Sequence, residues 1–305
     1  MTATTDTAAT RRHRAQIRQR RWAPYLFISP FFILFTCFMV VPIGAGVYLS
    51  LTRWAGLGSP EYIGLDNYVR LFGDQSFGAS LANTAFYTAF ALAVVLPASL
   101  LIAQALDARG LKLRDLFRLV YFLPVVLSPI IIALIFGLIF DGEYGLVNAV
   151  MEALFGFGGV SWLTDPWWAR IVVVVLVLWR WTGYLTIFFL AGMQAIPREL
   201  HEAAEVDGAG PVRRFFSVTL PQLRPVTAFI AVTMLVNTAQ IFEEPFLLTQ
   251  GGPGESTLSV SMFVYRAAFQ RQELGYAAAA GVVMFAIVFA LGRIGSSALG
   301  VGRTR

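Results

Sequence analysis

Six long runs of apolar residues, separated by shorter polar stretches, organise this chain of 305 residues. Each run has about the 20 residues that an α-helix needs to cross the hydrocarbon core of a bilayer. The runs lie near residues 23–51, 80–106, 119–140, 168–196, 226–248 and 276–298. The pattern predicts an all-α membrane protein with about six transmembrane helices, which form one domain over residues 23–298. Residues 1–22 and 299–305 are predicted to be tails, and the low apolar content of the first tail predicts disorder.

The overall composition agrees with a membrane protein. Hydrophobic side chains make up 57% of the residues and charged side chains 13%, whereas soluble domains average about 25% charged residues. The sole cysteine, Cys37, lies within the first apolar run, so the chain can form no internal disulfide. The composition excludes an ordinary soluble fold.

Basic residues are unevenly distributed among the polar stretches. They concentrate in the first tail, the second and fourth loops and the C-terminus, at Arg11, Arg12, Arg14, Arg18, Arg20, Arg21, Arg109, Lys112, Arg114, Arg118, Arg198, Arg213, Arg214, Arg224, Arg293, Arg303 and Arg305. Because short cytoplasmic loops carry an excess of Lys and Arg, both termini and the fourth loop are predicted to face the cytoplasm. The acidic loop 141–167 is then outside, and it is long enough for a short surface helix. The net charge of +5 is explained by topology and membrane lipid, so no nucleic acid partner is expected.

The fourth loop is a polar island over residues 197–225. Pro197 is expected to end the preceding helix, and residues 198–206 can form a short helix. Gly208 can adopt the left-handed turn that ends it, and Pro211 is suited to open the next helix. The sequence therefore predicts a helix, a glycine turn and a second helix.

Within this island, Glu202-Ala203-Ala204, Gly208 and Val218-Thr219-Leu220-Pro221 resemble the EAA loop of permease subunits in binding-protein-dependent ABC importers. The spacing matches in full, and Val218 in place of Ile is the only departure. In that family the loop is a coupling helix that docks on the ATP-hydrolysing subunit. The resemblance implies this role for Glu202, Ala203, Ala204, Gly208, Leu220 and Pro221. Small side chains suit it, because they let another protein approach the backbone.

The chain lacks the residues of an enzyme. No glycine-rich phosphate loop precedes its only lysine, Lys112. His13 and His201 are the only histidines, and there is no cysteine pair, so neither metal binding nor nucleophilic catalysis has a basis. We expect no catalytic residue, metal or cofactor, and any ATP and Mg²⁺ would be used by a partner subunit.

Polar residues inside the fifth apolar run are candidates for a substrate pathway. Thr233, Asn237, Gln240 and Glu244 recur at steps of four, three and four, which predicts one face of a single helix. Such residues are costly in a bilayer and tend to face a water-filled path. The alternative is hydrogen bonding between helices.

In the fourth apolar run, Arg180 and Tyr184 share a helix face through their i, i+4 spacing. An aromatic ring beside a polar fork could recognise a sugar. Alternatively, Arg180 forms an ion pair with Glu243 or Glu244.

A further resemblance points to the sugar-importing branch of the same family, similar to the membrane subunits of the maltose transporter. Residues 242–253, FEEPFLLTQGGP, resemble a signature of that branch, with Glu243 in place of Asp. Gly251, Gly252 and Pro253 should form a turn that ends the fifth helix at the outer surface.

The resemblance implies a type I ABC importer of a bacterial plasma (inner) membrane. Its partners would be a second permease subunit, a dimer of ATP-binding subunits and an extracytoplasmic solute-binding protein, and the substrate would be a sugar or oligosaccharide. Glycerol phosphate-type or polyol substrates remain alternatives, because Arg180 could meet a phosphate. A self-contained secondary transporter is the alternative from another class, although no two halves of the chain repeat each other. A membrane-embedded glycosyltransferase would need an acidic metal-binding motif, which the dispersed carboxylates of loop 141–167 do not form.

Overall fold

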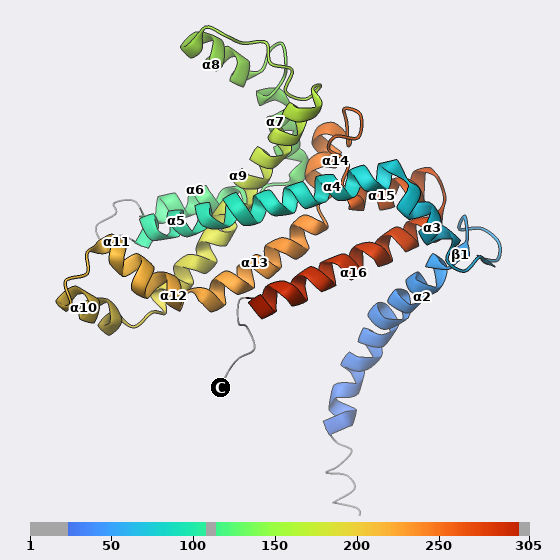
Figure 1. The fold of residues 1–305 in the computed structure, drawn as a ribbon, viewed down its shortest axis with the longest axis horizontal. Coiled ribbons are helices and arrows are strands. Elements are labelled where there is room, and N and C mark those ends of the chain that lie inside the picture. Colours follow the sequence, from blue (N-terminus) through green and yellow to red (C-terminus); the bar gives the residue numbers. More distant parts are fainter. Residues whose placement is uncertain (1–23, 108–113, 299–305) are drawn as a thin grey trace, which may run out of the picture.

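The computed structural model describes residues 24–107 and 114–298, and most of these residues are helical (Figure 1). This confirms the prediction of an all-α chain. The predicted tails at 1–22 and 299–305, and the basic residues Arg109 and Lys112, lie outside the described residues.

Four of the six predicted spans are single long apolar helices. They cover Pro24–Ser50, Gln75–Asp107, Pro166–Gln194 and Leu274–Gly295. The first span consists of a helix over residues 24–35, η1 (Thr36–Val40) and α2 (Val41–Ser50). The second consists of α4 (Gln75–Phe90), η2 (Ala91–Val95) and α5 (Leu96–Asp107). The other two are α9 (Pro166–Gln194) and α16 (Leu274–Ala298). The segments labelled η are single π-helical turns that continue the helix.

The third predicted span, 119–140, is not one straight helix. It consists of α6 (Arg114–Val126) and α7 (Pro129–Ile139), which are bent by 101° between residues 126 and 129. Pro129 explains the break, because the residue before a proline is pushed out of the helical region, and Ser128 has an extended conformation with ψ 132. Pro129 then occupies the first turn of α7, where its missing N–H costs nothing.

The fifth predicted span, 226–248, is also divided. α13 (Arg224–Ala239) ends before a second short helix, α14 (Glu243–Thr249). Pro245 has no N–H to donate to the carbonyl of Ile241, so a continuous helix would leave that carbonyl without a partner. In the observed fold, Ser259 Oγ donates to Ile241 O over 2.6 Å. A second bend, of 67°, lies before α13, between Pro211–Gln222 and Arg224–Ala239. With this bent pair and that of α6 and α7 each taken as one crossing, the described residues form up to six spans.

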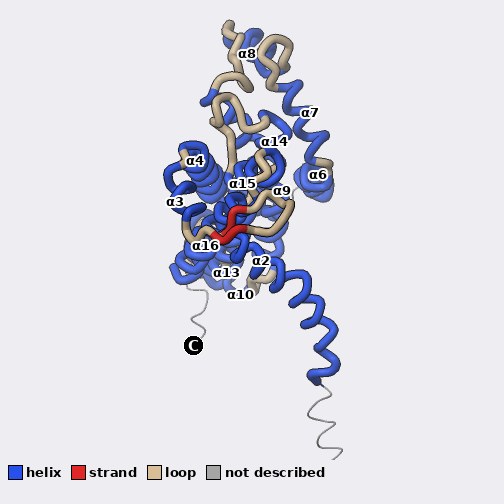
Figure 2. The backbone as a smooth tube through the Cα atoms, turned by 90° about the vertical axis from the view of Figure 1, so that its right-hand side faces the viewer, coloured by secondary structure: helices blue, strands red, loops and turns tan. Residues whose placement is uncertain are grey.

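Short elements lie at the two ends of the bundle (Figures 1 and 2). At one end are the hairpin β1 (Thr52–Arg53) and β2 (Glu61–Tyr62), together with α3 (Asp66–Gly73), α15 (Val260–Tyr265) and η4 (Arg266–Gln270). At the other end are α10 (Arg198–Val206), α11 (Pro211–Arg214), η3 (Phe215–Thr219) and α12 (Leu220–Gln222). α8 (Leu146–Phe155) extends from α7 and is the predicted short helix of loop 141–167.

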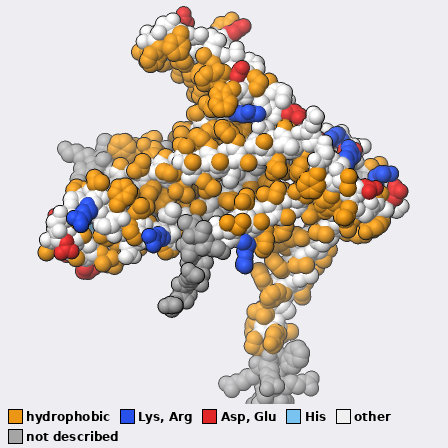
Figure 3. All heavy atoms as spheres, in the orientation of Figure 1, with side chains coloured by type: hydrophobic (Ala, Val, Ile, Leu, Met, Phe, Trp, Pro, Cys, Tyr) orange, Lys and Arg blue, Asp and Glu red, His pale blue; other side chains and the backbone are white. Residues whose placement is uncertain are grey.

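The core lies between α4, α5, α9 and α13, where Tyr87, Val177, Phe189 and Met234 are among the buried side chains. The outer surface is mainly apolar. Figure 3 shows hydrophobic side chains over the flanks of the bundle, while charged side chains gather mainly toward its ends. The most apolar window of Pro24–Ser50 has no buried residues. Because no water reaches the hydrocarbon region of a bilayer, this surface suits lipid and not water.

Candidate functional site

An arginine of α9 forms ion pairs with two carboxylates of α14. Arg180 Nη1 lies 2.9 Å from Glu244 Oε1 and 3.1 Å from Glu243 Oε2. The side chains of Arg180 and Glu244 are 15% and 7% exposed, whereas that of Glu243 is 53% exposed. The structure therefore contains the predicted ion pair of Arg180, which joins the α9 span to the short helix after the break.

A pocket of about 370 Å³ opens beside this ion pair. We call it the Arg180 pocket; it is lined by Val177, Arg180, Trp181, Asn237, Thr238, Gln240, Ile241, Phe242, Glu243 and Glu244. Its volume falls within the range of about 300–1,000 Å³ that is typical of small-molecule sites. The fold thus brings together four of the predicted pathway residues: Arg180, Asn237, Gln240 and Glu244.

The other two predicted pathway residues, Tyr184 and Thr233, do not line the Arg180 pocket. Tyr184 instead continues an aromatic row on α9. Its ring centroid lies 5.9 Å from that of Trp181 and 5.0 Å from that of Phe188, both edge to face. The guanidinium of Arg180 lies 5.7 Å from the centroid of the Trp181 ring. Trp181 is therefore the aromatic side chain that lies beside Arg180 in the pocket.

The predicted arrangement of Thr233, Asn237, Gln240 and Glu244 on one helix face is wrong. α13 ends at Ala239, so only the first two residues lie on that helix. Gln240 follows its end, and Glu244 belongs to α14. The break between Ala239 and Glu243, which Pro245 favours, explains the difference. It leaves Asn237, Gln240 and Glu244 around the same pocket.

The predicted turn of Gly251, Gly252 and Pro253 follows α14 and not α13. Gly251 has a φ of 85°, which favours glycine. The turn is held by hydrogen bonds from Thr257 Oγ1 to Gly252 O over 3.0 Å and from Arg266 Nη2 to Gln250 O over 2.6 Å. It fixes the C-terminal end of the helix that supplies Glu243 and Glu244.

The polar island forms the predicted helix, turn and helix at the end of the bundle opposite the β1–β2 hairpin (Figure 1). α10 covers Arg198–Val206, Gly208 is left-handed with a φ of 73°, and Pro211 opens α11. Arg214 Nη1 lies 2.6 Å from Glu205 Oε2 and ties α11 to α10. These three local predictions are confirmed.

The surface of this island is open. Glu202, Ala203 and Gly208 are exposed and Ala204 is half-buried. Apolar side chains are exposed around them as well: Leu200 at 39%, Val206 at 87%, Val212 at 72% and Phe216 at 62%. Leu220 instead packs on the buried core, and Pro221 is half-buried. We call the exposed surface of α10, Gly208 and α11 the α10 surface.

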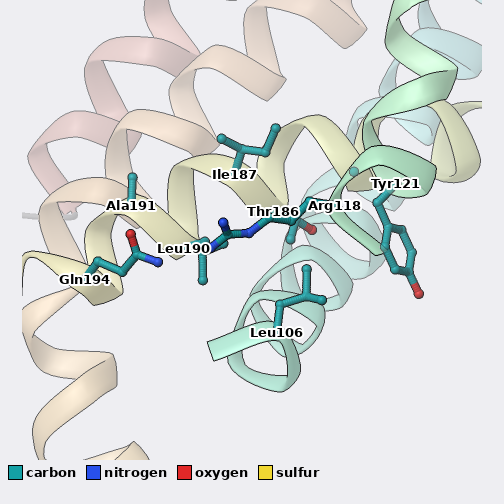
Figure 4. A pocket seen from close by; sticks show the side chains of 9 residues that line it. Leu106, Arg118, Tyr121, Thr186, Ile187, Leu190, Ala191 and Gln194 are labelled. Carbon is teal, nitrogen blue, oxygen red and sulfur yellow. The ribbon is translucent and has the colours of Figure 1, made fainter. Parts of the chain in front are cut away.

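A second pocket, of about 260 Å³, lies between α5, α6 and α9 (Figure 4). Its wall is mostly apolar, and Arg118, Tyr121, Thr186 and Gln194 supply its polar groups. Figure 4 shows Arg118 reaching from α6 towards α9. None of the predicted pathway residues lines this pocket, so the Arg180 pocket is the better candidate for substrate.

Phe242 also lines the Arg180 pocket, and the sequence alone predicts no pathway role for it. Trp181 is adjacent to Arg180, and Phe242 begins the segment FEEP. The proline in that segment is the available signal, because its missing N–H favours an interruption of the helix one turn earlier, where residues 240–242 lie.

Comparison with known proteins identifies relatives along most of the chain. The family of binding-protein-dependent transport system inner membrane components matches residues 96–298. YurN of Bacillus subtilis, a probable ABC transporter permease protein, is 38% identical over 281 residues, which cover 90% of this chain and 95% of YurN.

Two relatives at equal identity differ in substrate. The lactose transport system permease protein LacF of Rhizobium radiobacter is 35% identical, covering 88% of this chain and 90% of LacF. The sulfoquinovosyl glycerol transport system permease protein SmoG of Agrobacterium fabrum is also 35% identical, covering 86% of this chain and 85% of SmoG.

A solved structure has the same fold. It is a bacterial alginate ABC transporter in complex with an alginate pentasaccharide-bound periplasmic protein, and one of its chains matches with a TM-score of 0.81 and 25% identity. The match covers 92% of this chain and 95% of that chain. With the family match over residues 96–298 and relatives aligned along nearly their whole length, the chain belongs to the inner membrane components of binding-protein-dependent transport systems.

Proposed function

We propose that this chain is one of two membrane-spanning halves of an ATP-driven importer for a sugar or oligosaccharide. The Arg180 pocket forms part of the substrate path, and the α10 surface docks on an ATP-hydrolysing partner, which uses the ATP and Mg²⁺. An extracytoplasmic solute-binding protein delivers the substrate. Both termini and α10 face the cytoplasm of a bacterial cell.

One observation carries this proposal. The chain has an exposed α10 surface at one end of the bundle and a polar pocket on the other side of the buried core. The exposed small residues Ala203 and Gly208 permit close approach of another protein. Exposed apolar side chains such as Val206 and Val212 supply area that a partner can bury. The substrates in the relatives' names and the bound periplasmic protein of the solved transporter support the rest.

In this mechanism the chain transmits force and performs no chemistry. ATP binding changes the partner's conformation, the docked α10 moves with it, and the helices that carry the Arg180 pocket move in turn. Such coupling requires that nucleotide favour one of two conformations through the partner. α13 connects the two regions directly, because it begins at Arg224, at the end of the polar island, and ends at Ala239, beside the pocket.

The test is co-purification of the tagged chain from its native membrane, with mass spectrometry and an ATP hydrolysis assay. A Glu202→Lys variant reverses a charge on the α10 surface. A Glu152→Lys variant makes the same change at an exposed position of α8 and serves as the matched control.

We expect an ATPase and a second permease to accompany the wild type and the control, and the ATPase to be lost from Glu202→Lys. Retention of the ATPase by both variants would contradict docking through α10. Purification of every form alone, without ATP hydrolysis, would reject the ATP-driven importer and favour a self-contained transporter.

A further inference from the structure

We infer that the Arg180 pocket admits uncharged carbohydrate and disfavours anionic substrates such as phosphorylated, sulfonated or uronate sugars. This inference rests on the proposed function, since it names the charge class of the substrate. Family membership does not decide the matter, because the permeases for lactose and for sulfoquinovosyl glycerol are equally identical to this chain. The charges that line the pocket distinguish between uncharged and anionic substrates.

Three charged side chains line the Arg180 pocket, and two of them are carboxylates. Arg180 is the only cation among the lining residues, while Glu243 and Glu244 are the anions. The formal sum is one negative charge. An anion that entered would meet this like charge inside a protein pocket, where charges are screened less than in water.

The single guanidinium is already engaged. Arg180 Nη1 contacts Glu244 at 2.9 Å and Glu243 at 3.1 Å. A phosphate or sulfonate group would have to displace these carboxylates to use the arginine fork. Glu244 would then remain 7% exposed without its partner, which is strongly unfavourable for a buried charge.

The nearby helix ends leave this charge balance unchanged. α13 ends at Ala239 beside the pocket and directs the partial negative charge of its C-terminus there. α14 begins at Glu243, so the partial positive charge of its N-terminus lies beside the two carboxylates. The two partial charges are of similar size and opposite sign, and the negative sum of the side chains persists.

The groups that remain for a ligand suit hydroxyls. Among the described residues, the side-chain amides of Asn237 and Gln240 form no hydrogen bond. Each amide both donates and accepts, as a sugar hydroxyl does. The half-buried ring of Trp181 supplies an apolar face beside them. These features recognise a polyhydroxyl compound without requiring charge on it.

The first experiment measures the potential in the pocket and is independent of any transport activity. The exposed Gln240 is replaced in a Gln240→Cys variant on a Cys37→Ala background, which removes the only native thiol of this chain. The complex purified with this chain reacts with two methanethiosulfonates of similar size, one with a trimethylammonium group and one with a sulfonate group. Each rate is normalised to that of 2-mercaptoethanol. The control is Ser59→Cys, at an exposed position of the β1–β2 hairpin.

We expect the normalised cation rate at Gln240→Cys to exceed the anion rate by at least about tenfold, with a ratio near one at Ser59→Cys. Adding Glu243→Gln should lower the ratio several-fold, because this change removes the uncompensated charge and keeps the Arg180–Glu244 pair. A ratio of one or less at Gln240→Cys would overturn the inference, and it would leave the importer function untouched.

The second experiment identifies the substrate class. A strain that lacks this gene, and the same strain complemented with it, grow on a mixture of uncharged and anionic compounds. The mixture holds lactose, arabinooligosaccharides and diacetylchitobiose, together with sn-glycerol 3-phosphate, sulfoquinovosyl glycerol and alginate oligosaccharides. Mass spectrometry of the spent medium shows which compounds only the deletion strain leaves behind.

An uncharged carbohydrate left in the medium supports the inference. An anionic compound left there overturns the inference but keeps the importer. If both strains consume every compound alike, the proposed carbohydrate import fails, whatever the potential in the pocket.

Discussion

Gly183 of α9 lies against the main chain of Tyr121 on α6, and a Cβ atom added to Gly183 would overlap with the carbonyl oxygen of Tyr121. The backbone of Gly183 fixes the position of the added Cβ, and the atoms that it meets belong to the backbone of Tyr121. No side-chain rotation can therefore relieve the overlap. This contact lets two helices approach closely in the way that small residues permit in membrane proteins. The contact holds α6 against α9, the helix that carries Arg180, and α7 follows α6 along the chain.

Gly183→Ala is therefore expected to separate α6 from α9 and to destabilise the protein by about 1–3 kcal/mol, the usual cost of overpacking. Thermal unfolding of the detergent-solubilised complex measures the effect. Gly281→Ala is the matched control, because a Cβ at Gly281 of α16 meets nothing within 4 Å. Equal melting temperatures for the two variants would contradict the close approach.

The sequence predicts the parts of this fold that depend on interactions between residues close together in the chain. Apolar run length predicts where the spans lie, and local turn chemistry predicts α10 with Gly208 and Pro211. Pro129 and Pro245 are local signals for the two helix breaks. The length of an apolar run does not reveal these breaks, because the run continues through a broken helix. Which groups then meet across the breaks depends on packing between distant segments. Arg180 and Glu244 are 64 positions apart, and no spacing rule joins them.

The two carboxylates beside Arg180 should differ in importance. Glu244→Gln removes the buried partner, and loss of one member of a buried ion pair costs about 3 kcal/mol or more. Glu243→Gln changes a side chain that is 53% exposed, and such pairs contribute about 0–1 kcal/mol. Chemical denaturation of the solubilised chain compares the two variants. A larger loss in Glu243→Gln would show that the assignment of the two roles is reversed.

The hydroxyl of Ser259 should stabilise the break between α13 and α14. It donates to Ile241 O over 2.6 Å and accepts from Met262 N over 3.2 Å at the start of α15. Ser259→Ala removes both bonds, and we expect a loss of about 2 kcal/mol in unfolding free energy. Ser256→Ala is the control, because the buried Oγ of Ser256 finds no partner among the described residues. A Ser256→Ala variant as unstable as Ser259→Ala would contradict this explanation of the break.

Asp74 at the start of α4 should give the fold a pH dependence in the acid range. Burial opposes ionisation of its carboxylate, but hydrogen bonds from Tyr276 Oη and from the N–H groups of Phe77 and Ser76 outweigh this effect, and the pKa is lowered from 3.8. The lowered pKa stabilises the fold at pH values above 3.8, and this stabilisation is lost as pH falls through the lowered value.

Tyr276→Phe should raise the pKa of Asp74 and shrink this acid-range dependence, because it deletes the 2.7 Å bond between α16 and α4. NMR titration of ¹³C-labelled aspartate carboxyls gives the pKa directly. Tyr68→Phe removes a hydroxyl that contacts Ser50 Oγ instead, so the Asp74 titration should stay unchanged in that variant. An unchanged titration in Tyr276→Phe would mean that the phenol does not influence the carboxylate.

Gly208 sets the angle between α10 and α11, and its substitution should uncouple the α10 surface from the bundle. Its φ of 73° is strained for residues with a Cβ and most of all for β-branched ones. We expect Gly208→Val to reorient α10 and to reduce the ATPase that co-purifies, with little change in overall stability, because Gly208 is exposed and a Cβ there meets nothing within 4 Å. Gly210→Val is the matched control, since Gly210 has an ordinary φ of −66° and open space around it. The ratio of ATPase to permease in each purified sample is the measurement. If Gly210→Val lowers this ratio as much as Gly208→Val, the added side-chain volume at the α10 surface explains the loss of ATPase. The left-handed conformation of Gly208 would then not be its cause.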